Sequence, residues 1–138
     1  MFRKILVGYD GSESSENAFE KAIELAQKFQ SKIYVLTVGR IPEYIQTIDE
    51  VEEAKTQAKK FYSKILQKAE EKMKLKNLDY EILLEFGKPS DIIIKVAETL
   101  NIDLIVLGTK KHSYLKRILG ATVDKVVDNA HCSVLVVR

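Results

Sequence analysis

The chain has 138 residues, the size of one ordinary domain, and its formal net charge of +2 gives no large field that would favour nucleic acid or a membrane surface. Hydrophobic residues make up 46% of the sequence and charged residues 30%, a balance typical of folded rather than disordered chains. The single cysteine, Cys132, excludes an intrachain disulfide and a cluster of thiolate ligands.

Apolar runs and apolar stripes alternate along the whole sequence. In chain order they predict a strand at Ile5–Val7, a helix with its stripe from Ala18 to Phe29, a strand at Ile33–Val38, a long helix from Val51 to Ala69, a strand at Tyr80–Phe86, a helix from Ile93 to Leu100, a strand at Ile102–Leu107, a helix from Val123 to Ala130 and a strand at Val134–Val137. The structural interpretation of every stripe is that its apolar residues pack in the core.

Two of these elements carry additional signals. The run Tyr80–Phe86 has charged side chains at alternate positions, Glu81 and Glu85, so we expect this strand at an edge of the sheet. Ser90 is a candidate N-cap for the helix that follows, with Pro89 directly before it. The other strand runs are continuously apolar, which is typical of parallel strands buried on both faces.

Strict alternation of strands and helices predicts the fold class. It indicates an α/β domain with one open, doubly wound parallel sheet and helices on both faces. Right-handed crossovers leave few ways to connect such a sheet. Because the sequence contains no linker, repeat or low-complexity segment, we expect a single domain over residues 1–138.

Glycines mark the carboxyl ends of several predicted strands. Gly8, Gly11 and Gly108 stand at or just after such ends, and open α/β sheets bind ligands at that edge, where the strand order reverses. Glycine there permits positive φ and a close approach of backbone to ligand. A purely structural role in tight turns remains the alternative interpretation.

Motifs with established chemistry are absent from the sequence. It contains no G-x-x-x-x-G-K-[ST], no G-x-G-x-x-G after a strand and no G-x-S-x-G. Neither histidine, His112 or His131, has ligand spacing to another histidine or to the cysteine. We therefore name no catalytic residue, leave a metal site unassigned and do not expect an enzyme.

Three segments together resemble the universal stress protein family. They are KILVGYDGSESSENAFEKA (Lys4 to Ala22), GKPSDIIIKVAETLNIDLIVLGT (Gly87 to Thr109) and LGATVDKVVDNAHCSVLVVR (Leu119 to Arg138). The resemblance covers the whole chain and implies a five-stranded parallel sheet of order 3-2-1-4-5. It also implies a homodimer and, in many members, bound ATP. In that order the first and fourth strands are neighbours, which would bring Asp10 and Gly108 to one ligand.

The resemblance also implies a set of binding residues. Members that bind ATP carry G-x-x-G, nine residues, then G-[ST]; here Gly108 matches the first glycine and Lys111 stands at the second. Gly120 and Ala121 match the last pair if the loop is one residue shorter, and Ala121 and Thr122 match it without a gap. The implied nucleotide-binding residues are Gly8, Tyr9, Asp10, Val38, Gly108, Thr109, Lys110, Lys111, Gly120, Ala121 and Thr122, with ATP and its Mg²⁺ as the cofactor.

Three functions follow as hypotheses. The first is a regulatory domain of the stress response that binds ATP, in which a charge on Lys111 offsets the lost glycine. The second is a dimeric interaction module without nucleotide, because Lys110, Lys111, Lys116 and Arg117 also fit a solvated basic face. The third is a hydrolase or nucleotidyl transferase of the same broad fold, which the missing catalytic motifs disfavour.

The expected partner is a second copy of the chain. The predicted strand Val134–Val137 would form an apolar edge of the sheet, and exposed apolar edges pair. The first residues contain only a short apolar run, too short for the core of a signal peptide, and no segment reaches the length of a membrane span. We therefore expect a cytoplasmic protein that contacts neither nucleic acid nor membrane, with an unidentified signalling partner.

Overall fold

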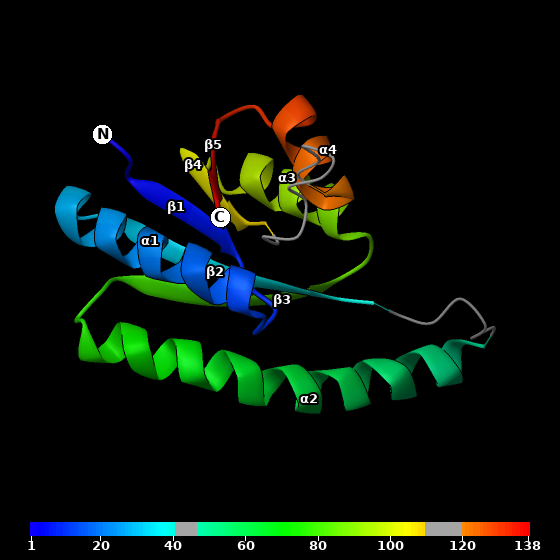
Figure 1. Cartoon of the computed structure of the whole chain (residues 1–138). Helices are drawn as coiled ribbons and strands as arrows, with labels where there is room; N and C mark the ends of the chain where they lie inside the picture. Colours follow the sequence, from blue (N-terminus) through cyan, green and yellow to red (C-terminus); the bar gives the residue numbers. More distant parts are fainter. Residues whose placement is uncertain (41–46, 110–119) are drawn as a thin grey trace.

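The computed structural model describes residues 1–40, 47–109 and 120–138. Strands and helices alternate along these residues in the predicted sequence of elements (Figure 1). The elements are β1 (Lys4–Gly8), α1 (Glu13–Phe29), β2 (Lys32–Gly39), α2 (Ile48–Leu75), β3 (Tyr80–Phe86), α3 (Pro89–Thr99), β4 (Leu104–Gly108), α4 (Ala121–Asn129) and β5 (Ser133–Val137).

The five strands form one parallel sheet in the order β3-β2-β1-β4-β5. Ile5 of β1 lies opposite Ile33 of β2 on one side and Leu104 of β4 on the other. The sheet grows outward from β1 in one direction through β2 and β3, and then in the other through β4 and β5. The point at which this direction reverses lies between β1 and β4. The predicted fold class and strand order are confirmed.

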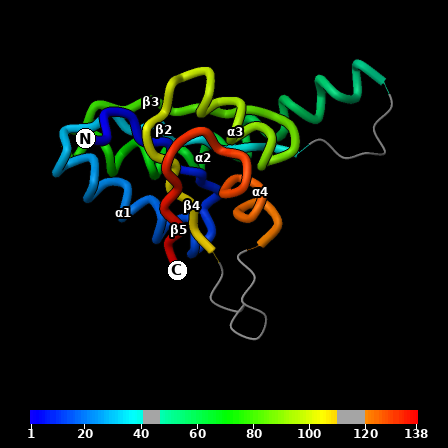
Figure 2. Tube along the Cα trace, turned by 90° about the horizontal axis from the view of Figure 1, so that it is seen from above, coloured from blue at the N-terminus to red at the C-terminus, as the bar shows by residue number. Residues whose placement is uncertain are grey.

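Helices cover both faces of the sheet and divide the core in two. Helices α1 and α2 pack on one face and α3 and α4 on the other (Figures 1 and 2). Successive residues of a strand point to opposite faces, so Ile5 packs with Phe19 and Met73 whereas Leu6 packs with Ile93 and Val126. All six of these side chains from strands and helices are buried.

Helix α2 is longer than its apolar stripe predicts. It begins at Ile48 because the Thr47 side chain caps it, accepting a hydrogen bond from the Glu50 backbone N–H at 3.1 Å. Its buried residues, Leu66, Ala69 and Met73, all lie in the second half. The first half extends past the ends of β2 and β3, away from the body of the protein (Figure 1).

The prediction that Ser90 caps α3 is wrong. The N-cap is Lys88, whose backbone is extended, and none of the described side chains caps this helix. Pro89 occupies the first helical turn, where its missing N–H and fixed φ cost nothing, and it holds the preceding residue extended. Ser90 therefore lies inside the helix, where it is buried.

The sheet has β3 and β5 at its two edges. The prediction that Tyr80–Phe86 is an edge strand is confirmed, with the same bounds. On β5, Leu135 is 37% exposed, so an apolar side chain reaches the surface there. Among the helices that the structure describes, none is both long and apolar enough to cross a membrane.

Candidate functional site

The candidate site lies at the carboxyl edge of the sheet, where β1 and β4 end side by side. Val7 and Val106 are the last pair between the two strands, so the pairing of β1 with β4 ends just before Gly8 and Leu107. The chain continues from β1 into a short loop at Tyr9–Ser12 and from β4 into Thr109. This is the topological switch point at which open α/β sheets bind ligands.

Two hydrogen bonds tie the start of the β1 loop to β2. The Tyr9 N–H donates to the Leu36 carbonyl at 2.8 Å, and the Thr37 hydroxyl donates to the Tyr9 carbonyl at 2.6 Å. Thr37 is completely buried, so this hydroxyl is shielded from water and its bond is not easily replaced. The Tyr9 backbone is therefore held in place before the chain turns toward α1.

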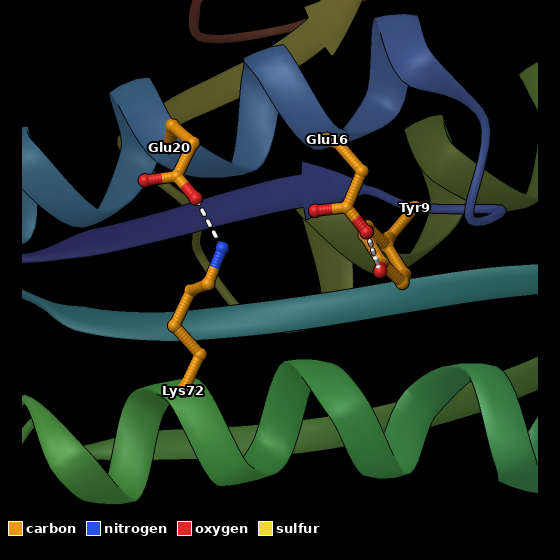
Figure 3. A network of polar contacts seen from close by, with 4 residues as sticks. All are labelled: Tyr9, Glu16, Glu20 and Lys72. Atoms are coloured by element: carbon orange, nitrogen blue, oxygen red, sulfur yellow. Dashed lines mark hydrogen bonds and ion pairs between the residues drawn. The ribbon is translucent and has the colours of Figure 1, made fainter.

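The Tyr9 side chain points into the core between the sheet and α1. Its ring meets that of Phe19 edge-to-face at 5.4 Å, and its hydroxyl donates to the Glu16 carboxylate (Figure 3). Burial raises the pKa of Tyr9, and the Glu16 contact raises it further, so the phenol stays protonated. Only the backbone of this predicted site residue remains for a ligand at the sheet edge.

Asp10 is exposed at the tip of the β1 loop. Its carboxylate accepts the Ser12 backbone N–H at 2.9 Å, and its own backbone N–H donates to the Ser15 hydroxyl at 3.3 Å. Desolvation raises the pKa of this carboxyl, but hydrogen bonds from Ser12 and Ser15 outweigh it and lower the pKa overall. The side chain therefore carries a fixed negative charge beside the switch point.

The serine-rich turn builds the first turn of α1. The Ser12 side chain caps the helix by accepting the Ser15 N–H at 3.2 Å, and the Ser15 hydroxyl donates back to the Ser12 carbonyl at 3.0 Å. Gly11, with φ of 83°, makes the left-handed bend that brings the chain into this cap. The turn has a structural role that fully accounts for Ser12 and Ser15.

Gly108, at the end of β4, lies directly under the first turn of α1. A Cβ placed on this residue would be 2.0 Å from the Ser14 carbonyl oxygen and 3.1 Å from the Ser15 nitrogen. No side chain fits in that space, so glycine allows the two backbones to meet. The end of β4 therefore contacts the first turn of α1, which directly follows the β1 loop, and this contact gives Gly108 a packing role.

Helix α4 begins at the same end of the sheet (Figure 2). Its N-cap is Gly120, with φ of 106°, and no side chain of the described residues caps the helix. A Cβ on Gly120 would meet none of the described atoms within 4 Å. Ala121 is exposed and Thr122 is half-buried. Uncapped N–H groups and the positive end of the helix dipole are suited to an anion.

The remaining predicted site residues are Val38, Thr109, Lys110 and Lys111. Val38 packs on the sheet face covered by α3 and α4, whereas Tyr9 belongs to the opposite face, so their side chains do not meet. Thr109 is buried, and its N–H donates to the Val137 carbonyl at 2.9 Å. Lys110 and Lys111 lie outside the described residues. Sequence reasoning missed Thr37 and Ser14, whose roles depend on contacts between distant segments.

The groups at this edge of the sheet are ones that can bind a ligand. They are a charged carboxylate, backbone groups and the N-terminus of a helix. Among the residues that the structure describes, no group of three or more His, Cys, Asp or Glu side chains is arranged to hold a metal ion.

Comparison with known proteins gives one consistent family. The model of the Universal stress protein family matches residues 1–138. "Universal stress protein YxiE" of Bacillus subtilis is 33% identical, with 100% of both chains covered. "Universal stress protein UspA from Lactobacillus plantarum" matches in structure with a TM-score of 0.78 and 27% identity, covering 99% of this chain and 98% of that one.

Two further structures of the same fold were solved with a nucleotide. One is a universal stress protein in complex with cAMP, with a TM-score of 0.76 and 22% identity over 99% of this chain and 97% of that one. The other is a family protein of Arabidopsis thaliana with AMP bound, with a TM-score of 0.69 and 18% identity over 98% and 90%. At these identities the likeness extends to the fold alone.

Proposed function

The chain belongs to the universal stress protein family, and from this premise we propose that it is a regulatory domain that binds ATP or a closely related adenine nucleotide. In this proposal the backbone around Gly8, Tyr9 and Val38 lines the adenine, and Asp10 accepts hydrogen bonds from the ribose. The phosphates lie against Gly108, Thr109, Lys110, Lys111, Gly120, Ala121 and Thr122, accompanied by Mg²⁺.

One observation carries the proposal: the first turn of α1, which follows the β1 loop, meets the end of β4 at Ser14 and Gly108, at the end of the sheet where no side chain of the described residues caps α4. A carboxylate on one side and open N–H groups on the other suit a ligand with a hydroxylated sugar and an anionic tail. The solved structures with cAMP and AMP bound support the adenine nucleotide as a class.

Lys111 is the residue at which the sequence departs from the family signature. A lysine in place of the second glycine removes some freedom for backbone contact with phosphate and adds a positive charge. A charge-assisted hydrogen bond contributes roughly 1.5–3 kcal/mol, enough to offset one backbone contact. The proposal therefore expects micromolar affinity, about −5.5 to −8 kcal/mol.

Calorimetric titration with Mg-ATP tests the proposal directly. We expect binding in the wild type and a loss of roughly tenfold or more in Lys111→Ala, since one such contact exceeds about 1.4 kcal/mol. Lys111→Gly restores the usual residue and should lose less than the alanine variant. Lys28→Ala, in the last turn of α1, removes the same charge at the opposite end of that helix and should bind as the wild type does.

Two controls separate the parts of the ligand. Asp10→Ala should weaken binding of ATP, ADP and AMP by similar factors, because the ribose is common to all three. Repeating the titration with a chelator tests the contribution of Mg²⁺. Absence of heat and of a thermal shift at millimolar ATP would replace the proposal by the dimeric interaction module without nucleotide.

We also propose a homodimer through the strand Val134–Val137. In support, β5 is an edge strand with apolar residues reaching the surface. Isologous pairing of two such edges gives a closed dimer in which neither β5 edge is left unpaired. Light scattering should give a dimer mass that Val136→Lys reduces. A monomer mass at micromolar concentration, unchanged in that variant, would contradict this interface.

A further inference from the structure

The first half of α2 lacks the packing that holds the second half. The buried residues of this helix begin at Leu66, whereas residues 48–62, all of which the structure describes, are half-buried or exposed. Lys55 lies over the ring of Phe86 at 5.7 Å, which is where the end of β3 meets the helix. Beyond that contact the helix continues for about two turns away from the sheet (Figure 1).

An apolar stripe runs along one side of this projecting half. It consists of Ile48, Val51, Ala54, Ala58 and Phe61, and we call it the α2 stripe. Its spacing of three and four residues repeats as in the seam of a coiled coil. Ile48 is 81% exposed and Phe61 is 62% exposed, so large apolar surface at both ends of the stripe faces water.

Charges beside the stripe are segregated along the helix. The first two turns carry Asp49, Glu50, Glu52 and Glu53, and the next turns carry Lys55, Lys59, Lys60 and Lys64. Within the described part of the chain, Glu52, Glu53, Lys59 and Lys60 form no ion pair. Glu52 and Glu53 are thus adjacent on the helix, as are Lys59 and Lys60, and the two pairs lie about two turns apart.

We propose that the α2 stripe is a self-association surface, on which a second copy of this chain docks the same helix in the antiparallel direction. With the two-fold axis near Thr56, residues at equal distances on either side of it face each other. Glu52 then faces Lys60 of the second copy, and Glu53 faces Lys59. A parallel pair would instead set acidic turns against acidic turns and basic turns against basic turns, which is unfavourable.

The same register matches the apolar residues from Val51 to Phe61, whereas Ile48 faces Lys64 of the second copy. Val51 faces Phe61 of the second copy, so the exposed aromatic ring of the stripe covers a smaller side chain. Ala54 faces Ala58, and two small residues at the centre let the helix backbones approach closely. Each contact is made twice by symmetry, which is the condition for an isologous interface.

This surface is separate from the proposed β5 contact. Helix α2 packs on β2 and β3, near one edge of the sheet, whereas β5 forms the opposite edge. Both contacts can therefore form in one assembly, and each is tested without the other. The association measured below is a monomer–dimer step if α2 acts alone and an association between β5-paired dimers if β5 also pairs.

Charge reversal tests the direction and the register. Sedimentation velocity is measured on Glu52→Lys/Glu53→Lys and on Lys59→Glu/Lys60→Glu. Each variant alone should lose roughly tenfold or more in association, because every cross-pair becomes repulsive, and an equimolar mixture of the two should recover it. Glu71→Lys/Glu98→Lys makes the same charge change at exposed residues away from the stripe and should sediment as the wild type does.

Disulfide trapping gives a second, independent readout. In a Cys132→Ser background, a mixture of Ala54→Cys and Ala58→Cys chains should cross-link on oxidation, and Ala54→Cys alone should not. Cross-linking of Ala54→Cys with itself would indicate parallel helices and overturn the proposal. Wild-type sedimentation that neither charge variant changes, together with no cross-link in the mixture, would overturn it as well.

Discussion

Gly108 lies so close to Ser14 that a Cβ on the glycine would be 2.0 Å from the serine's carbonyl oxygen. The end of β4 and the first turn of α1 are thus in backbone contact, although the two residues are far apart in the sequence. This contact fixes the distance between the two loops that we propose as the nucleotide site. It also gives Gly108 a packing role that does not depend on a ligand.

Replacing Gly108 with alanine should destabilise the fold. The new methyl group meets backbone rather than a flexible side chain, so α1 must shift, at a cost of about 3 kcal/mol or more. Gly120→Ala is the matched control, because its φ of 106° strains alanine but the surrounding space is open. We expect about 1–2 kcal/mol there. Urea unfolding measures the free energy of unfolding of both variants. Equal losses of stability in the two variants would contradict this prediction.

Removing the Thr37 hydroxyl should loosen the β1 loop. Thr37→Val keeps the shape but leaves the buried Tyr9 carbonyl without this donor, at a cost of about 1–3 kcal/mol. Thr37→Ser keeps the hydroxyl and loses only a methyl group, so it should retain the loop geometry. Hydrogen exchange of the amides of Tyr9 to Ser12 reports the loop directly. Equal exchange in the two variants would show that the hydroxyl does not hold it.

Acidification should act through Asp10. Hydrogen bonds from Ser12 and Ser15 lower the pKa of this carboxyl below its ordinary value of 3.8 in the folded state, despite opposing desolvation. Its contribution is therefore present above that value and is lost as the pH falls through the lower folded pKa. Asp10→Asn lacks this titration, so its stability should fall less steeply with acid than that of the wild type. Parallel slopes in thermal melts would contradict the assignment.

A charge in the middle of the sheet should be far more damaging than one on the surface. Val106 is fully buried, and Val106→Asp places a carboxylate without a partner there, at a cost of several kcal/mol. Val127, on α4, is 46% exposed, so Val127→Asp makes the same chemical change in water. Thermal unfolding should separate the two variants widely. An unchanged melting temperature in Val106→Asp would contradict the strand assignment.

The elements that the sequence predicts best are those whose signal is local. The strand Tyr80–Phe86 has the predicted bounds because its alternating charges and flanking polar residues act within the segment itself. The start of α2 was predicted too late, since an apolar stripe does not detect the polar first turn that Thr47 caps. Ser90 was assigned as a cap on residue type alone, although a proline in the first turn moves the boundary back to Lys88.

The strand order predicts which residues share the carboxyl edge of the sheet but not the contacts between them. Because β1 and β4 are neighbours, Asp10 and Gly108 follow strands that end at the same edge. The inward turn of the Tyr9 ring could not be predicted, because it depends on Phe19 and Glu16 of α1. Contacts of this kind arise from packing between segments and have no signature in the local sequence.

The sheet separates two hydrophobic cores that share only its backbone. Phe19 belongs to the core beneath α1 and α2, and Ile93 to the core beneath α3 and α4. Mutations on the two sides should therefore add in free energy, since no side chain touches both members of such a pair. In evolutionary terms, one side of the molecule can be repacked while the other keeps its sequence. Diversity among relatives can then accumulate one face at a time around an unchanged sheet.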